Sequence, residues 1–174
     1  MGERTLALLR QLDAACESAD QLEAAAVTAF EQHPDAEIIT SFPGLGLLLG
    51  ARLLAEVGDD RSRFHDARAL KAYAGSAPVT RASGKKSSVR VRRVKNDRLA
   101  TAGYRWSFCT LTASPGSRIH YDRRRAAGDG HAAALRNLSN RLLGCLHHCL
   151  QQRVHYDEAT AFPTTTATRL GLAS

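Results

Sequence analysis

Apolar residues recur at helical spacing along most of the chain, and this pattern predicts a mainly α-helical fold. Residues 5–32 contain no Gly or Pro and are rich in Ala, Leu, Gln and Glu, which favour helix. Within this segment the apolar positions alternate at spacings of four and three, which is a heptad pattern. These positions are Leu8, Leu12, Ala15, Ala19, Leu22, Ala26 and Ala29. The segment is therefore expected to be either a coiled-coil strand or one helix of a bundle.

Breaks in the pattern divide the rest of the chain into shorter helices. Pro34 ends the first helix, because proline cannot continue the backbone hydrogen bonds. Apolar periodicity after it predicts helices over residues 47–57, 67–74, 99–113, 117–126 and 131–154. Asp66 is the expected N-cap of the helix over 67–74, and Asn96 or Asp97 caps the next one. One face of the last helix carries Leu135, Leu138, Leu142, Leu146 and Leu150.

One segment reads as β structure. After Pro78, Val89, Val91 and Val94 alternate with cations, which predicts a short ribbon over residues 87–94 with valines inward and arginines outward. The residues from Thr160 onward are polar and without pattern, so we expect disorder there. The predicted organisation is a coiled-coil-like arm over 1–36, a compact helical domain with a small β-ribbon over 37–158, and a disordered tail over 159–174.

A tight turn is predicted at Pro43-Gly44-Leu45-Gly46, between two short helical segments. Two glycines that flank one apolar residue resemble the hairpin of helix-hairpin-helix DNA-binding modules. In such a hairpin the backbone N–H groups at a helix N-terminus can hold a phosphate. Pro43, Gly44 and Gly46 are therefore candidate binding residues. A purely structural helical turn explains the same residues.

Positive charge is concentrated in one stretch. Between Arg81 and Arg98, eight basic residues stand against one acid, and this net charge of +7 equals that of the whole chain. So many neighbouring cations repel one another unless a polyanion neutralises them, and a phosphate backbone is the usual one. The candidate nucleic-acid-binding residues are Arg81, Gly84, Lys85, Lys86, Arg90, Arg92, Arg93, Lys95 and Arg98, with a second cluster at Arg123, Arg124 and Arg125.

The first 40 residues have the opposite charge, with eight acids and two bases, a net charge of −6. This arm should avoid nucleic acid, so self-association into a homo-oligomer is its expected role. No apolar run approaches twenty residues and no leader pattern is present, which predicts a cytoplasmic protein without a membrane contact. His65, His120 and His131 lie near predicted loops, where solvated positions are expected.

Metal-ligand patterns are weak. Cys145 and Cys149, with His148 between them, would put two sulfurs on one helical face, but no second pair completes a zinc site. Buried, reduced thiols are the favoured interpretation. Asp59-Asp60 is the only adjacent acidic pair after residue 41, and it reads as a helix-ending loop. We therefore expect no metal and no cofactor in this chain.

The order of motifs resembles one family over roughly residues 38–157. The motifs are Pro-Gly-Leu-Gly, LLAEVGD, RALKAYAGSAPVTRASGKK, KNDRLATAGYRWSF and YDRRRAAGDGHAAALRNLSNRLLG. Together they are similar to the C-terminal transposase domain of the insertion-sequence one-hundred-and-ten family, the bridge-RNA-guided recombinases. The resemblance implies DNA transposition in which Ser83 attacks a DNA phosphate and holds the cut strand. It also implies a structured guide RNA that pairs with the DNA.

In that family the serine works beside a metal site in a RuvC-like N-terminal domain. Met1 falls within the part that resembles the coiled-coil connector, so this domain is expected to be missing, and Mg²⁺ is expected there rather than here. Three hypotheses remain open. The first, which we favour, is a truncated transposase that carries Ser83 and needs a partner for the metal. The second is a non-catalytic helix-hairpin-helix DNA- or RNA-binding module. The third is a helical scaffold whose charge is merely solvated.

Overall fold

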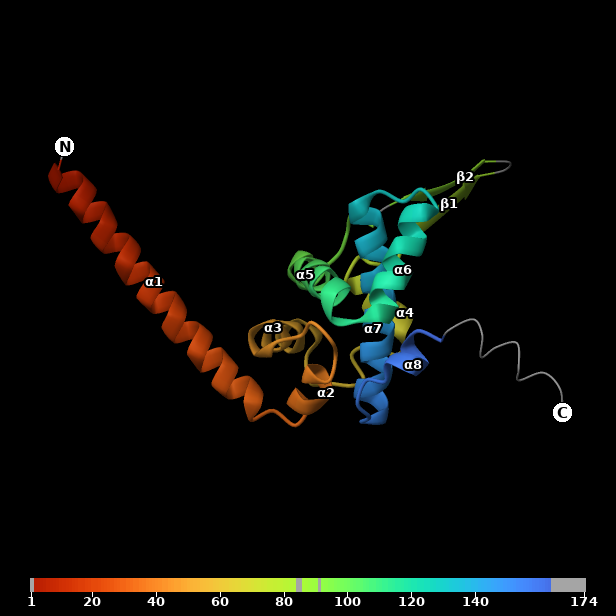
Figure 1. The fold of residues 1–174 in the computed structure, drawn as a ribbon, viewed down its shortest axis with the longest axis horizontal. Coiled ribbons are helices and arrows are strands. Elements are labelled where there is room, and N and C mark those ends of the chain that lie inside the picture. The colour runs from red at the N-terminus through yellow and green to blue at the C-terminus, as the bar shows by residue number, and fades with distance from the viewer. Residues whose placement is uncertain (1, 84–85, 91, 164–174) are drawn as a thin grey trace.

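The computed structural model describes residues 2–83, 86–90 and 92–163, and it confirms the mainly α fold (Figure 1). Two strands form a small antiparallel sheet, and helices make up most of the remainder. The helices are α1 (Gly2–Glu31), α2 (Ala36–Thr40), α3 (Leu47–Val57), α4 (Ala67–Tyr73), α5 (Asp97–Ala113), α6 (Pro115–Ala126), α7 (His131–Gln152) and α8 (Glu158–Ala161). The strands are β1 (Val79–Ser83) and β2 (Lys86–Arg90).

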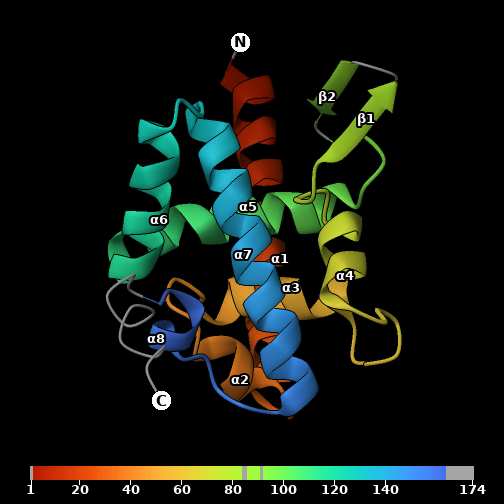
Figure 2. The same cartoon turned by 90° about the vertical axis from the view of Figure 1, so that its right-hand side faces the viewer.

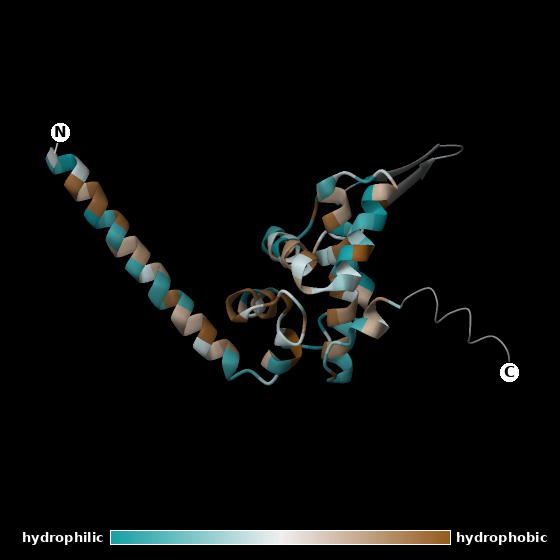
Figure 3. Cartoon of the chain, viewed as in Figure 1, coloured by the Kyte–Doolittle hydropathy of each residue, from teal (hydrophilic) through white to brown (hydrophobic). Residues whose placement is uncertain are grey.

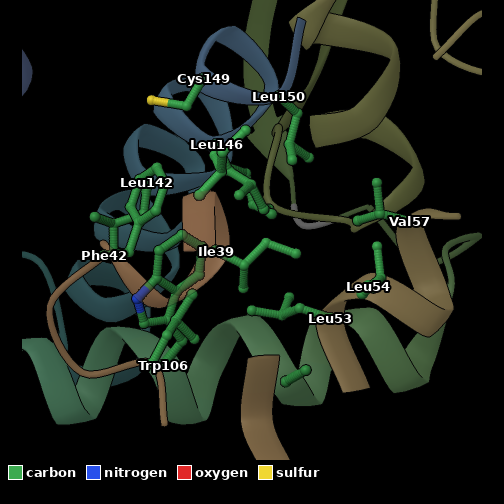
Figure 4. Packing of buried hydrophobic residues seen from close by; sticks show 14 of the residues in the cluster. Ile39, Phe42, Leu53, Leu54, Val57, Trp106, Leu142, Leu146, Cys149 and Leu150 are labelled. Atoms are coloured by element: carbon green, nitrogen blue, oxygen red, sulfur yellow. The ribbon is translucent and has the colours of Figure 1, made fainter. Parts of the chain in front are cut away.

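Helix α7 is the centre of the body, and α4, α5 and α6 all pack against it (Figure 2). The predicted leucine face is buried along its whole length, from Leu135 to Leu150. Figure 4 shows how Leu142 and Leu146 meet Ile39, Phe42 and Trp106 from α2, the following turn and α5. Burial of these side chains is the main stabilising contribution to the fold.

Helix α1 extends away from this body as a lone helix (Figure 1). Phe30 is its only buried residue, and it packs so closely on α3 that a Cβ at Gly50 would lie 2.9 Å from the Phe30 ring. The predicted seam is exposed: Leu8, Leu12 and Leu22 keep 66%, 59% and 72% of their surface. Figure 3 shows these apolar segments recurring along the arm. The helix is confirmed, and its pairing in a coiled coil stays a prediction.

Side-chain caps begin the helices largely where the sequence predicts them. The Asp66 carboxylate accepts a hydrogen bond from the Ala69 amide at 2.7 Å, and the Asn96 side chain accepts one from Leu99 at 3.0 Å. Ser114 follows α5 and is also the N-cap of α6, because its hydroxyl accepts a hydrogen bond from the Ser117 amide at 3.0 Å. Pro115 then occupies the first turn of α6, where its missing N–H costs nothing.

The predicted ribbon over residues 87–94 is wrong in its bounds and in the inward position of Val94. Strand β2 ends at Arg90, which pairs with Val79, and Val94 is 90% exposed. A strand needs a partner for its backbone groups, and residues 79–83 supply the nearest one. Pro78 precedes Val79 and has no N–H to donate, so the ladder stops there. The hairpin projects from the helices (Figure 1), and the side chains of Val89 and Val91 lie outside the described residues.

The start of the predicted disordered tail is ordered. Asp157 caps α8 by accepting a hydrogen bond from the Thr160 amide at 2.9 Å. Phe162 then packs on the first turn of α6, where a Cβ at Gly116 would lie 2.7 Å from it. Residues 164–174 lie outside the described part of the chain. Among the described residues, no helix has the length and apolar character needed to span a bilayer.

Candidate nucleic-acid interface

The Pro43–Gly46 turn connects α2 to α3 and is braced against α5. The indole N–H of buried Trp106 donates a hydrogen bond to the Pro43 carbonyl at 3.1 Å. Gly44 has a φ of +76°, and a Cβ there would lie 2.9 Å from the Thr110 backbone nitrogen. Only glycine combines this left-handed conformation with so close an approach. The turn is therefore fixed in position by the core.

The start of α3 offers free backbone donors. Gly46 is its N-cap and has no side chain that could accept their hydrogen bonds, while its own carbonyl accepts the Gly50 amide at 2.8 Å. The amides of Leu47, Leu48 and Leu49 consequently have no partner within the helix. Gly46, Leu47 and Leu48 are exposed. This arrangement suits a phosphate oxygen, although phosphate binding at Pro43, Gly44 and Gly46 stays a prediction.

Ser83 ends β1, is exposed, and pairs across the hairpin with Lys86. Its hydroxyl has no hydrogen-bonding partner within the part of the chain that the structure describes. Gly84 and Lys85, which connect the strands, lie outside the described residues, and so do the side chains of Arg81 and Lys86. No described group is thus placed as a base for Ser83.

The basic residues after the hairpin differ in availability. Arg90, Arg93 and Arg98 are exposed and Arg92 is half-buried. Lys95 instead forms an ion pair with Asp97, with 2.6 Å between the ammonium nitrogen and a carboxylate oxygen. The predicted binding stretch therefore has at least three exposed guanidinium groups near the hairpin.

A polar network that the sequence did not reveal closes the root of the hairpin. The Asn96 side-chain amide donates to Glu56 of α3 at 2.7 Å and to the Tyr73 hydroxyl of α4 at 2.8 Å. Its backbone amide donates to the Tyr73 carbonyl at 2.8 Å, and Arg63 donates to the Tyr73 hydroxyl at 2.9 Å. These hydrogen bonds join the two ends of the segment over residues 74–95, which includes the hairpin, to each other and to α3. Spacing in sequence gives no sign of this, since Glu56 and Asn96 lie 40 residues apart.

The second basic cluster, at the end of α6, is largely engaged in structure. Arg124 pairs with Asp129 at 2.6 Å, and Arg125 donates to the Asp129 carbonyl at 2.6 Å. Arg123 lies 3.2 Å from a ring nitrogen of His120. These contacts fix the loop before α7 and leave less charge for a ligand than the sequence suggests.

The structure corrects the expectation of solvated positions for the three histidines at one of them, His120. His120 is only 7% exposed, with its other ring nitrogen 2.9 Å from Asn137. Burial lowers the pKa of His120, which favours its neutral form, and the ring does not take the solvated position that the sequence predicts. His131 is exposed and lies 2.7 Å from the Tyr121 hydroxyl, whereas His65 is exposed as expected. Of the three histidines, only His120 is buried, whereas His65 and His131 are exposed.

The structure does not bring the two predicted DNA contacts together. Figures 1 and 2 place the β1–β2 hairpin at one end of the helical body and the turn between α2 and α3 toward the other. The end of α6 lies at the same end of the body as the hairpin. A ligand that touched both sites would have to extend along the whole body.

No described group of three or more His, Cys, Asp or Glu side chains could hold a metal ion. Cys149 is buried and Cys145 half-buried, both are free thiols, and burial raises the pKa of each. This agrees with the interpretation of these cysteines as packing residues. The described residues accordingly do not fit a Mg²⁺ site of their own.

Comparison with known proteins gives consistent matches. The model of the "Transposase IS116/IS110/IS902 family" matches residues 36–122. A Streptomyces coelicolor protein named as a transposase of the IS117 mini-circle is 65% identical over 161 residues, which are 92% of this chain and 39% of that protein. A 42 kDa protein of insertion element IS900 from Mycobacterium paratuberculosis is 40% identical over 75% of this chain and 33% of its own length. A 43.6 kDa protein of IS110 from Streptomyces coelicolor is 36% identical over 86% and 37%. The chain spans less than two fifths of the length of these relatives.

Proposed function

Because the chain belongs to the IS116/IS110/IS902 transposase family, we propose that it is the serine-carrying, nucleic-acid-binding part of a DNA transposase. The main support for this proposal is the exposed Ser83 at the end of β1, which is followed by the stretch that holds the net positive charge of the chain. A DNA-acting role also agrees with the cytoplasmic location expected from the sequence.

In the proposed reaction the Ser83 hydroxyl oxygen forms a bond to a DNA phosphorus while one P–O ester bond of the strand breaks. The serine proton leaves to a base, and the released DNA oxygen takes up a proton. Cations near the hairpin stabilise the negative charge that builds up on the phosphate. A serine hydroxyl is a poor nucleophile without activation. The base and the metal must therefore come from a part of the transposase outside the described residues, where a RuvC-like domain with Mg²⁺ is our expectation.

The proposal includes two partners besides DNA. A structured guide RNA would select the DNA by base pairing, while the protein contacts backbones through the basic stretch and the Pro43–Gly46 turn. A second copy of the chain would cover α1, whose exposed leucines gain by leaving water. The acidic character of this arm favours protein over nucleic acid as its partner.

The first test measures the affinity of the chain for duplex DNA and for a structured RNA across a salt series. A slope of log affinity against log salt of about −4 to −6 is expected for duplex DNA, at roughly 0.9 per neutralised phosphate. Neutralising Lys85, Lys86, Arg90, Arg92 and Arg93 should abolish most of this slope. Removing two charges from α1, by Arg4→Gln with Arg10→Gln, is the control and should leave it unchanged. Binding that ignores salt and these substitutions would support the scaffold hypothesis instead.

The second test addresses Ser83. Strand transfer is measured after the chain is joined to the part of the IS117 relative that it does not cover. Ser83→Ala should remove strand transfer and the covalent protein–DNA product while binding persists, and Ser87→Ala is the control. Unchanged strand transfer in Ser83→Ala would overturn the catalytic role and leave the non-catalytic binding module.

A further inference from the structure

An apolar slot between α3 and α5 is not used by the proposed chemistry. It has a volume of about 330 Å³, and its walls come from both helices. Leu48 and Leu49 of α3 form one wall, and Tyr104 and Phe108 of α5 form the other. Phe108 is 57% exposed and Tyr104 42%, so both rings are accessible. Because they are four residues apart on one helix, the two rings lie on the same face.

Positive charge stands at both sides of this slot. Arg52 of α3 and Arg105 of α5 line it, both are exposed, and neither has an ion-pair partner among the described residues. No carboxylate is present in the lining, which Cys109 completes. Two free guanidinium groups beside exposed aromatic rings are a combination that suits a nucleotide, whose base is flat and whose phosphate is anionic.

The slot also adjoins the braced turn at the start of α3. Gly44 packs on the α5 backbone at Cys109 and Thr110, and Cys109 itself lines the slot. Leu48 belongs both to the slot and to the first turn of α3, where the free amides lie. A base in the slot would therefore lie beside Arg52 and Arg105 and next to the first turn of α3.

We propose that the slot between α3 and α5 binds one unpaired nucleotide, with its base against Tyr104 and Phe108 and its phosphates on Arg52 and Arg105. This proposal rests on the proposed nucleic-acid-binding function and specifies single-stranded or unpaired nucleic acid as the form recognised there. A base inside a duplex is stacked on both faces and cannot enter, so the slot selects for an open strand.

A partner protein is the less suitable occupant. The neighbouring groove between α1 and α3 has a volume of about 630 Å³, and small apolar residues line it together with charges of both signs, Arg52 and Arg98 beside Glu56 and Asp59. That groove has the character of a protein contact, because its two carboxylates offset its two arginines and leave no net attraction for a phosphate. The slot differs from it in lacking acids and in presenting two aromatic rings.

The test is fluorescence anisotropy with a single-stranded oligonucleotide of about ten nucleotides and a blunt duplex of the same length. Phe108→Ala should weaken single-strand binding about tenfold and leave duplex affinity unchanged. Phe108→Leu should lose nearly as much, because leucine keeps the apolar contact and lacks the aromatic face. Ile119→Ala, on α6, removes a side chain of similar exposure and is the control. Arg52→Gln with Arg105→Gln should reduce the single-strand salt slope by about 1.4, at roughly 0.7 per phosphate.

A direct readout is photocrosslinking with a strand that carries 5-iodouracil, followed by peptide mapping. The expected crosslinks lie on Tyr104 or Phe108. Equal loss of duplex and single-strand affinity in Phe108→Ala, or no crosslink on α5, would overturn the proposal that the slot binds an unpaired nucleotide. If these substitutions changed the oligomeric state of the chain and left its single-strand affinity unchanged, the result would also overturn the proposal and assign the slot to a protein interface. Salt-dependent duplex binding by the basic stretch separates these results from a failure of the proposed function, which would remove both kinds of binding.

Discussion

Gly44 and Gly46 are equivalent in the sequence, where each flanks Leu45, but the structure gives them different roles. Gly44 has a positive φ and no room for a Cβ against the α5 backbone. Gly46 has a φ of −83°, and a Cβ added there meets nothing within 4 Å. The first glycine therefore attaches the turn to the core, whereas the second leaves the start of α3 open to solvent.

This difference predicts opposite results for two alanine substitutions. Gly44→Ala should lower the free energy of unfolding by about 2 to 4 kcal/mol, from the left-handed backbone and the clash with Thr110. Gly46→Ala should cost less than about 1 kcal/mol, because only the N-cap preference changes. Urea unfolding followed by fluorescence of Trp106, the single tryptophan, measures both. Similar losses in the two variants would contradict the assignment.

Single residues also show what a sequence can specify locally. The caps at Asp66 and Asn96 were predictable, because a side chain and the amide it accepts are three residues apart. The buried position of His120 was not, since it depends on Asn137 and Phe162 from elements beyond its own helix. The exposed, unpartnered Ser83 is an intermediate case. Its place near a turn was readable, but the resemblance to a family, not its local chemistry, singled it out.

At the scale of elements, helices were predicted better than strands. The leucine face of α7 repeats over about four turns, so its period alone indicates which side is buried. The hairpin has two strands of only five residues each, and β2 ends before Val94, which the valine alternation had placed inward but which is 90% exposed. Pro78, which has no N–H to donate, precedes the first residue of the hairpin's ladder. The fold of α8 depended on long-range contacts, such as Glu158 accepting the Gly116 amide at 2.7 Å.

The root of the hairpin provides a prediction at this scale. Asn96→Asp keeps an oxygen to cap α5 but loses the donor to Glu56 and Tyr73 and places a second carboxylate beside Glu56. The loss of two hydrogen bonds should destabilise the protein by about 2 kcal/mol. Hydrogen exchange at the Asn96 amide, which is bonded to the Tyr73 carbonyl, should accelerate on the order of tenfold.

Tyr73→Phe tests the same root from the other side and leaves the α5 cap intact. It should accelerate exchange at the same amide, because Asn96 and Arg63 both lose their partner. Thr101→Ala, an exposed change within α5, is the control. Unchanged protection of the Asn96 amide in both root variants would mean that the network does not hold the hairpin to the body.

At the scale of the whole molecule, charge and apolar surface are separated. The net positive charge follows the hairpin, while α1 is acidic and exposes one leucine after another. A helix of 30 residues is about 45 Å long, and only its last turn is anchored by Phe30. Most of the stability of a helix in a protein comes from packing its apolar face against other elements. Within the described part of one chain, the seam leucines of α1 make no such contact. The seam was fully readable from sequence, but whether it pairs depends on contacts that the described residues of one chain do not provide.

We therefore expect α1 to self-associate, and a matched pair of double variants separates its seam from its charge. Leu12→Glu with Leu22→Glu places two carboxylates on the seam, whereas Gln11→Glu with Gln21→Glu adds the same charge at neighbouring positions off the seam. Each leucine that leaves an interface costs about 1.5 to 3 kcal/mol, so the seam variant should weaken association by on the order of a thousandfold or more. Sedimentation equilibrium should then find wild type and the Gln variants oligomeric and the Leu variants monomeric. Far-UV circular dichroism should show the helix loss that follows in the monomer. A monomeric wild-type chain with a fully formed α1 would contradict this, because the arm would then be stable without burying its leucines.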